Sequence, residues 1–215
     1  MMHETTAQAG EDSAWISVEL PLSQRDAYAF IQQTELLFRL NPYLAIKTWQ
    51  DGAPGRIYPG KKIHLDALNE MNGMQQPVNI SVTDVQPDKS YTLSYDRGLK
   101  QATAFTVESI TPNTCRLTVK ERYPAEISVA EREARLNEVD KSLVPWGAAI
   151  LGYFKRSKRW GWLPLYSRFQ DSFWFGMVPR HRRIARMLIW ITVLEFAVFL
   201  FVIVIYWLEL GRGHI

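Results

Sequence analysis

The sequence predicts an α+β protein in which an antiparallel sheet is followed by a long helix and then by one transmembrane helix. Short β-rich runs separated by turn signals follow one another between residues 43 and 123, with no helical pattern between them, which favours an antiparallel meander. The run at residues 187–208 is apolar except for one charge. At about 1.5 Å per residue it forms a helix of roughly 33 Å, which is long enough to cross a hydrocarbon core of about 30 Å.

The chain begins with a polar tail, residues 1–13, that lacks the basic and apolar regions of a secretory signal. We therefore expect that the domain after it is not exported. Residues 15–20 alternate polar and apolar side chains up to a proline, which predicts a first strand. Ser23 is a suitable helix N-cap, and the pattern after it predicts a single helix over residues 24–40 that ends before an Asn-Pro pair.

Six more strands are predicted from β-rich runs that are each bounded by glycine, proline or asparagine. They cover residues 44–50, 62–70, 78–85, 91–96, 102–110 and 115–123. The lone Cys115 lies in the last of these runs, where we expect it to be a strand residue without a disulfide partner in the chain.

A helical pattern begins at Ser128 and continues to Trp160. Its apolar side chains recur at steps of three and four residues and form a continuous stripe along one face. The stripe consists of Leu136, Val139, Leu143, Trp146, Ile150 and Tyr153. Pro145 lies inside it and removes one backbone hydrogen bond, so we expect a kink at this point and no end of the helix.

Five segments within residues 14–154 together carry a resemblance to a known family. They are SVELPLSQRDAYAFI, LNPYLAIKTW, YPGKKI, VTDVQPDKSYTLSYD and AFTVESITPNTCRLTVKERY. With the long helix after them, they resemble the helix-grip domain of the START-like superfamily, also called SRPBCC, which includes pollen allergens, polyketide cyclases and ubiquinone-binding proteins. The resemblance implies a curved antiparallel β-sheet wrapped around the long helix.

The same resemblance implies a cavity between the sheet and the long helix that accepts a hydrophobic ligand. Its candidate lining consists of apolar and aromatic side chains expected to face inward. They are Phe30, Ile46, Leu65, Leu93, Phe105, Val107, Leu117, Leu143, Trp146, Ile150 and Tyr153. Trp146 and Tyr153 are large enough to shape the floor or the mouth. The alternative is that these side chains simply pack against one another.

Residues for catalysis or metal binding are few. The histidines, at positions 3, 64, 181 and 214, lie far apart in different segments, so their spacing brings no two of them to one metal ion. The sequence has no nucleophile-elbow, zinc-protease or phosphate-binding glycine motif. We therefore expect a protein that is not an enzyme and binds no cofactor or metal, with cyclase-like activity as the weaker alternative.

Positive charge is concentrated next to the apolar run. Residues 1–154 carry 15 basic and 19 acidic side chains, a net charge of −4, whereas residues 155–186 carry nine basic side chains and one acidic one, a net charge of +8. The positive-inside rule predicts that the leading domain is cytoplasmic. We expect a single-pass protein, in a bacterial inner membrane. Such local basicity argues for anionic lipid headgroups and against nucleic acid as the partner.

Residues 155–186 also contain many aromatic side chains, a mixture typical of a membrane interface. The predicted interface residues are Lys155, Arg156, Lys158, Arg159, Trp160, Trp162, Trp174, Arg180, Arg182 and Arg183. The alternatives are a linker packed on its own domain and a surface for a partner protein.

Glu195 is the one charged residue within the apolar run. An intramembrane carboxyl group is costly, so it is either protonated or paired with a polar group of a neighbouring chain. Only the tail at residues 209–215 would cross the membrane. The sequence thus predicts a membrane-anchored protein that binds an apolar small molecule such as a lipid, isoprenoid or quinone. The alternative is an accessory or assembly subunit that contacts another membrane protein and binds no ligand.

Overall fold

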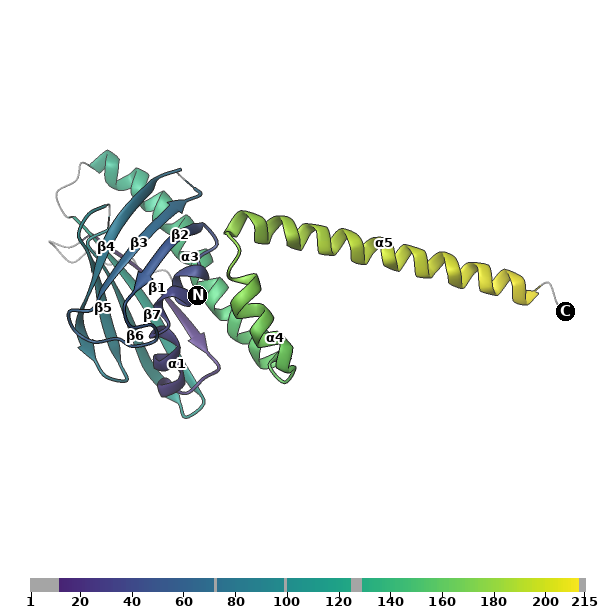
Figure 1. The fold of residues 1–215 in the computed structure, drawn as a ribbon, viewed down its shortest axis with the longest axis horizontal. Coiled ribbons are helices and arrows are strands. Elements are labelled where there is room, and N and C mark those ends of the chain that lie inside the picture. Colours follow the sequence, from purple (N-terminus) through teal and green to yellow (C-terminus); the bar gives the residue numbers. More distant parts are fainter. Residues whose placement is uncertain (1–11, 72, 99, 125–128, 213–215) are drawn as a thin grey trace. The chain divides into compact units, whose positions relative to one another are not determined.

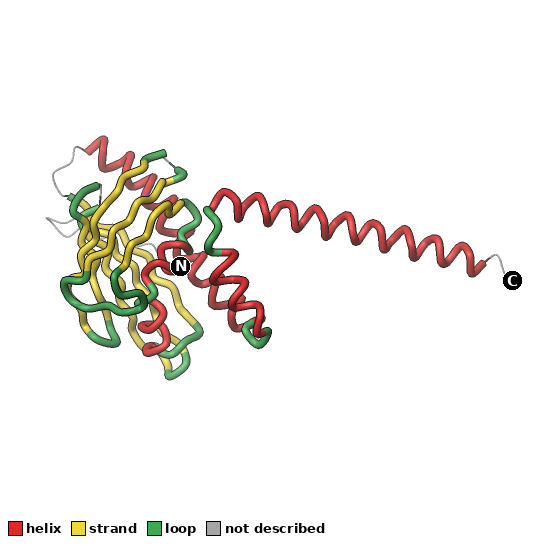
Figure 2. Tube along the Cα trace, viewed as in Figure 1, coloured by secondary structure: helices red, strands yellow, loops and turns green. Residues whose placement is uncertain are grey.

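The computed structural model describes residues 12–71, 73–98, 100–124 and 129–212, and side chains of the long helix from residue 142 onward. Its contacts divide the chain into two compact units at Gly176 and Met177. The first unit contains the sheet and the helices α1 to α4, and Figures 1 and 2 show its long helix α3 running across the curved sheet. The second unit contains helix α5.

The sheet has seven antiparallel strands in the order β1-β7-β6-β5-β4-β3-β2. The strands are β1 (Asp12–Leu20), β2 (Leu44–Asp51), β3 (Lys62–Asn69), β4 (Gln75–Gln86), β5 (Ser90–Tyr95), β6 (Ala102–Thr111) and β7 (Thr114–Tyr123). The meander of six strands is confirmed, and the first strand pairs with the last, with Val18 opposite Leu117. Cys115 lies buried in β7, where burial raises the pKa of its thiol to about 11.

The predicted helix over residues 24–40 is wrong in one respect, because two helices, α1 (Gln24–Ile31) and α2 (Thr34–Arg39), take its place. Ser23 caps α1 as predicted, since its Oγ accepts a hydrogen bond of 3.2 Å from the amide of Asp26. Helix α1 ends where the Ile31 carbonyl accepts a hydrogen bond from the Tyr91 hydroxyl of β5. That carbonyl is therefore satisfied without a further helical turn.

Helix α3 (Val129–Trp160) is unbroken at Pro145, so the prediction of a helix that continues past this proline is confirmed. Its described buried residues Leu143, Trp146, Ile150 and Phe154 pack into the core cluster with the inner face of the sheet. The helix lies close to β1 at Gly147, where an added Cβ would lie 2.6 Å from Ile16 Cδ1. Sheet and helix together form the predicted helix-grip architecture.

Two short helices follow in the first unit, α4 (Pro164–Arg168) and the π-helix η1 (Phe169–Trp174). The second unit is dominated by α5 (Pro179–Arg212). Within it, Pro179–Leu210 has a mean hydropathy of 2.8 in its most apolar window, and no residue of that window is buried. In length and composition this helix is suited to crossing a membrane.

Candidate functional site

The residues predicted to line an internal cavity lie together between the sheet and α3. All of them except Tyr153, which is partly buried, belong to the buried core cluster. They contact one another directly, as in the edge-to-face pair of Phe105 and Trp146, with ring centroids 6.0 Å apart, and the stacked pair of Phe30 and Tyr153, at 5.5 Å. In the described part of the interior these side chains pack as a core, and their contact with a ligand stays a prediction.

A cleft of about 470 Å³ opens elsewhere in the same unit, beside α2. Its walls come from three separate segments: α2 with the residue before it, the end of β2 with the loop after it, and η1. The lining residues are Gln33, Thr34, Glu35, Leu36, Arg39, Trp49, Asp51, Pro54, Gly55 and Asp171.

Two polar groups of this cleft are buried without a hydrogen-bond partner among the described residues. They are the hydroxyl of Thr34, a residue that is 1% exposed, and the indole N–H of Trp49. An unpaired buried polar group typically costs about 1–3 kcal/mol, so most such groups in proteins are paired. The indole donates only, whereas the hydroxyl both donates and accepts. A bound molecule with a carbonyl or hydroxyl oxygen has the chemistry to satisfy both groups.

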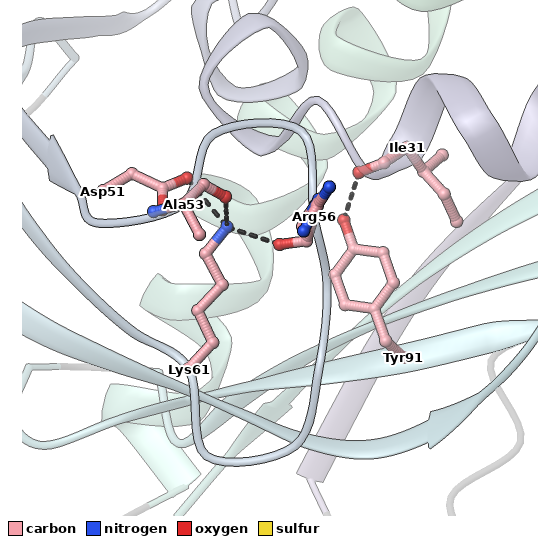
Figure 3. A network of polar contacts seen from close by, with 6 residues as sticks. All are labelled: Ile31, Asp51, Ala53, Arg56, Lys61 and Tyr91. Atoms are coloured by element: carbon pink, nitrogen blue, oxygen red, sulfur yellow. Dashed lines mark hydrogen bonds and ion pairs between the residues drawn. The ribbon is translucent and has the colours of Figure 1, made fainter.

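The loop that forms one wall is held in place by Lys61, which is 2% exposed. The Lys61 ammonium donates to Asp51 Oδ2 at 2.8 Å and to the carbonyls of Ala53 and Arg56 at 2.7 and 2.6 Å (Figure 3). Gly55, which lines the cleft, has a φ of +70°, a conformation that other residues rarely adopt. These contacts hold the loop in its conformation, so this wall of the cleft forms without a ligand.

Asp171 of η1 brings a carboxyl group to the cleft. It accepts a hydrogen bond of 3.1 Å from the hydroxyl of Tyr153 on α3. Partial burial raises the pKa of the Asp171 carboxyl, and the hydrogen bond from Tyr153 acts in the opposite direction. Burial also raises the pKa of Tyr153, and the neighbouring Asp171 charge adds to this rise. The pair therefore holds its protons more tightly than isolated side chains do.

The remaining charges of the cleft are largely neutralised. Arg39 forms an ion pair with Glu35 at 2.8 Å, and Asp51 forms the buried pair with Lys61. Because Arg39, the cation among the described lining residues, is already paired, the cleft offers hydrogen bonds more readily than a charge for an anionic ligand. Its chemistry fits a neutral molecule with a polar end.

Sequence reasoning did not single out Thr34, Trp49 or Asp171 as ligand-binding residues. Thr34 lies in what the sequence predicts as the middle of a helix, and Trp49 lies in a predicted strand, so neither carries a local motif. Asp171 does differ from its surroundings, because it is the one acid within the basic residues 155–186. This difference in charge is the sequence feature that could have identified Asp171 as a candidate site residue.

The predicted membrane-interface residues are spread over both units. Lys155, Arg156, Lys158, Arg159 and Trp160 are exposed in the last turns of α3. Trp162 after them is also exposed, whereas Trp174 of η1 is partly buried against the core. In α5, Arg180, Arg183 and Glu195 are exposed and Arg182 is buried. No membrane contact follows from these positions alone, so the interface stays a prediction.

The histidine with a described environment in the sheet is His64 of β3. Its Nδ1 lies 2.9 Å from Asn79 Oδ1, so the ring is hydrogen-bonded to the neighbouring strand. Within the described ranges, no group of three or more His, Cys, Asp or Glu side chains could hold a metal ion.

No protein-family model and no curated protein matches this chain. Several solved structures are similar to it. A START superfamily protein from Mycobacterium smegmatis is 16% identical with a TM-score of 0.51, and the match covers 68% of this chain and 99% of that one. A protein from Nitrosomonas europaea is 11% identical with a TM-score of 0.52, over 68% and 96% of the two chains.

The di-domain ARO/CYC protein BexL, from the BE-7585A biosynthetic pathway, is 12% identical with a TM-score of 0.52. The match covers 66% of this chain and 45% of BexL. At these identities the similarity concerns the fold alone. The chain therefore shares the helix-grip fold of these proteins, and its ligand must be argued from its own residues.

Proposed function

We propose that this chain is a membrane-anchored START-like protein that binds a hydrophobic molecule with a neutral polar end, and that this end lies in the cleft beside α2. One observation carries the proposal: Thr34 and Trp49, whose hydroxyl and indole N–H are buried without a hydrogen-bond partner among the described residues, both belong to the wall of a cleft of about 470 Å³. This volume is within the range of about 300–1,000 Å³ that is usual for small-molecule sites.

The apolar side chains around these groups support a hydrophobic ligand. Leu36, Trp49 and Pro54 form part of the lining. The polar end accepts a hydrogen bond from the Trp49 indole and exchanges one with Thr34, and the paired charges of Arg39 and Asp51 favour a neutral group over an ionised one. An isoprenoid alcohol or a quinone has this chemistry.

Anchoring in the cytoplasmic membrane is the second part of the proposal. It is supported by the length and apolarity of α5 and by the basic residues just before its apolar run. Holding the domain at the bilayer surface raises the local concentration of a lipid-soluble ligand around it. It also shortens the aqueous path of a poorly soluble molecule.

The test is native mass spectrometry of the full-length chain purified in a neutral detergent. We expect one apolar molecule per chain, which extraction with organic solvent identifies. Thr34→Val and Trp49→Phe keep the shape of each side chain and remove its polar group. We expect each variant to retain the molecule less well, by about tenfold for one lost buried hydrogen bond.

Thr111→Val is the matched control, because Thr111 is exposed and is not part of the cleft lining. The thermal unfolding of the ligand-free variants separates binding from folding. Removal of an unpaired buried group leaves stability unchanged or raises it. Full retention of the molecule by both cleft variants contradicts the proposal.

A second candidate function is an accessory subunit of a membrane complex, and the observation that favours it is Glu195. This carboxyl is exposed on α5 within the apolar run, where a partner helix with a hydrogen-bond donor would satisfy it. Stable co-purification with another membrane protein, lost on Glu195→Leu, supports this function. Co-purification that is unchanged by Glu195→Leu argues against it.

A further inference from the structure

A second cleft of the first unit, of about 480 Å³, lies against the last turns of α3. The end of β1 and the start of β7 form its other side. Its lining residues are Glu19, Leu20, Pro21, Thr114, Leu151, Lys155, Lys158 and Arg159. We call it the basic groove.

Three cations line one side of the basic groove. Lys155, Lys158 and Arg159 are three and four residues apart, so they project from the same face of α3. All three are exposed, and the ion pairs between described residues include none of them. The Arg159 guanidinium lies 5.3 Å from the ring centre of Trp160. The groove's own acid, Glu19, is 3.3 Å from Arg116 of β7.

Beside these cations the basic groove has an apolar part, to which Leu151 of α3 and Leu20 and Pro21 at the end of β1 contribute. Leu20 is buried, and Leu151 is partly buried and packs against the core cluster. Pro21 completes this surface. Cations near a helix C-terminus are favourable in any case, because they compensate the helix dipole. Compensation of the helix dipole requires the cations alone. A lipid with an anionic headgroup requires the cations and an apolar surface beside them.

We infer that the basic groove binds one acidic phospholipid, with the phosphate at Lys155, Lys158 and Arg159 and the glycerol and first acyl carbons on Pro21 and Leu151. Nucleic acid is a poorer fit, because the phosphate chain would have to approach a domain whose residues 1–154 carry a net charge of −4. The inference concerns a different site from the α2 cleft and does not depend on a ligand there.

The experiment uses the full-length chain in a neutral detergent, titrated with phosphatidylglycerol or phosphatidylcholine and analysed by native mass spectrometry. We expect one tightly retained phosphatidylglycerol per chain and no comparable retention of phosphatidylcholine. A triple variant, Lys155→Gln, Lys158→Gln and Arg159→Gln, should weaken this retention by roughly fivefold for each charge removed. Equal retention of the two lipids overturns the inference.

The matched control removes three exposed cations that do not line the basic groove: Arg25→Gln, Lys62→Gln and Lys89→Gln. It changes the net charge by the same amount and should keep the lipid. An equal loss in both triple variants overturns the inference, because it would show a general charge effect.

Leu151→Gln tests the apolar side of the basic groove while all three cations remain. We expect it to weaken phosphatidylglycerol retention. Because Leu151 also packs against the core cluster, the unfolding temperature of the variant is measured too, and retention is compared at a temperature at which both chains are folded. Inorganic phosphate and glycerol 3-phosphate are the competitors that distinguish a lipid from a free phosphate. Displacement of the lipid by either one at similar concentration overturns the lipid assignment in favour of a simple phosphate site.

Discussion

The ammonium of Lys61 lies 2.8 Å from the carboxylate of Asp51, and the two side chains are only 1% and 5% exposed. The pair joins the end of β2 to the start of β3, and the same ammonium also binds two carbonyls of the loop between these strands. This contact fixes one wall of the α2 cleft.

Lys61→Met should therefore destabilise the protein strongly. It leaves the Asp51 carboxylate buried without its cation, which costs about 3–5 kcal/mol in comparable sites. Chemical unfolding in detergent measures the loss. Lys62→Met is the control, since Lys62 is the exposed neighbour and should cost little. A second change, Asp51→Asn, should recover part of the loss because the buried charge is gone; failure to recover any would contradict this account.

Tyr91→Phe removes the hydroxyl that binds the Ile31 carbonyl at the end of α1. Because this contact is buried, we expect a loss of about 1–3 kcal/mol in the free energy of unfolding. Tyr58→Phe serves as the comparison, because Tyr58 is 49% exposed. If both substitutions have the same small effect, the Tyr91 contact does not stabilise the end of α1.

These two contacts also explain which parts of the fold the sequence predicts and which it does not. The strands follow from a two-residue alternation and from turn residues, both of which are local signals. The break between α1 and α2 coincides with a hydrogen bond from Tyr91, which lies 60 residues away from Ile31. The local pattern of residues 24–40 is helical throughout, so it gives no indication of this break.

The candidate site was harder to predict for the same reason. Lys61 belongs to the turn segment YPGKKI and looks like an exposed lysine, yet it is buried because Asp51 and the loop carbonyls surround it. Thr34, Trp49 and Asp171 come from three distant segments and form no sequence motif. Only the folded chain brings them to one cleft.

Gly147→Ala should destabilise the contact between α3 and β1. The new methyl group would lie 2.6 Å from Ile16 Cδ1, and overpacking of this kind costs about 1–3 kcal/mol, which exceeds the helix-propensity gain of about 1 kcal/mol. Ile16→Val removes Cδ1, so the double variant should recover most of the loss. A double-mutant cycle on the free energy of unfolding measures this coupling.

Gly152→Ala in the same helix provides the contrast. There the nearest atom to an added Cβ is the end of the flexible Arg156 side chain, at 3.2 Å. We expect this substitution to be neutral or to stabilise the helix by up to about 1 kcal/mol. Equal destabilisation by the two glycine substitutions would show that helix α3 is sensitive to any change and not to the close approach of Ile16.

Asp171 should make the stability of the domain depend on pH in the acidic range. Because burial raises its pKa in the folded state, the folded chain binds this proton more tightly than the unfolded chain does. The stabilisation is fully present below the ordinary pKa of an aspartate and is lost as the pH rises through the folded-state pKa. Asp171→Asn stays uncharged at every pH and should remove this part of the dependence.

The measurement is the unfolding midpoint of the parent chain and of Asp171→Asn across the acidic range, in the same detergent. We expect the difference in unfolding midpoint between the parent chain and Asp171→Asn to change in the pH window between the ordinary and the raised pKa of Asp171. Outside this window the difference should be constant. Tyr153→Phe removes the hydrogen bond that lowers the Asp171 pKa, so it should move this window to higher pH. A window that stays in place in Tyr153→Phe would show that this hydrogen bond does not influence the Asp171 carboxyl.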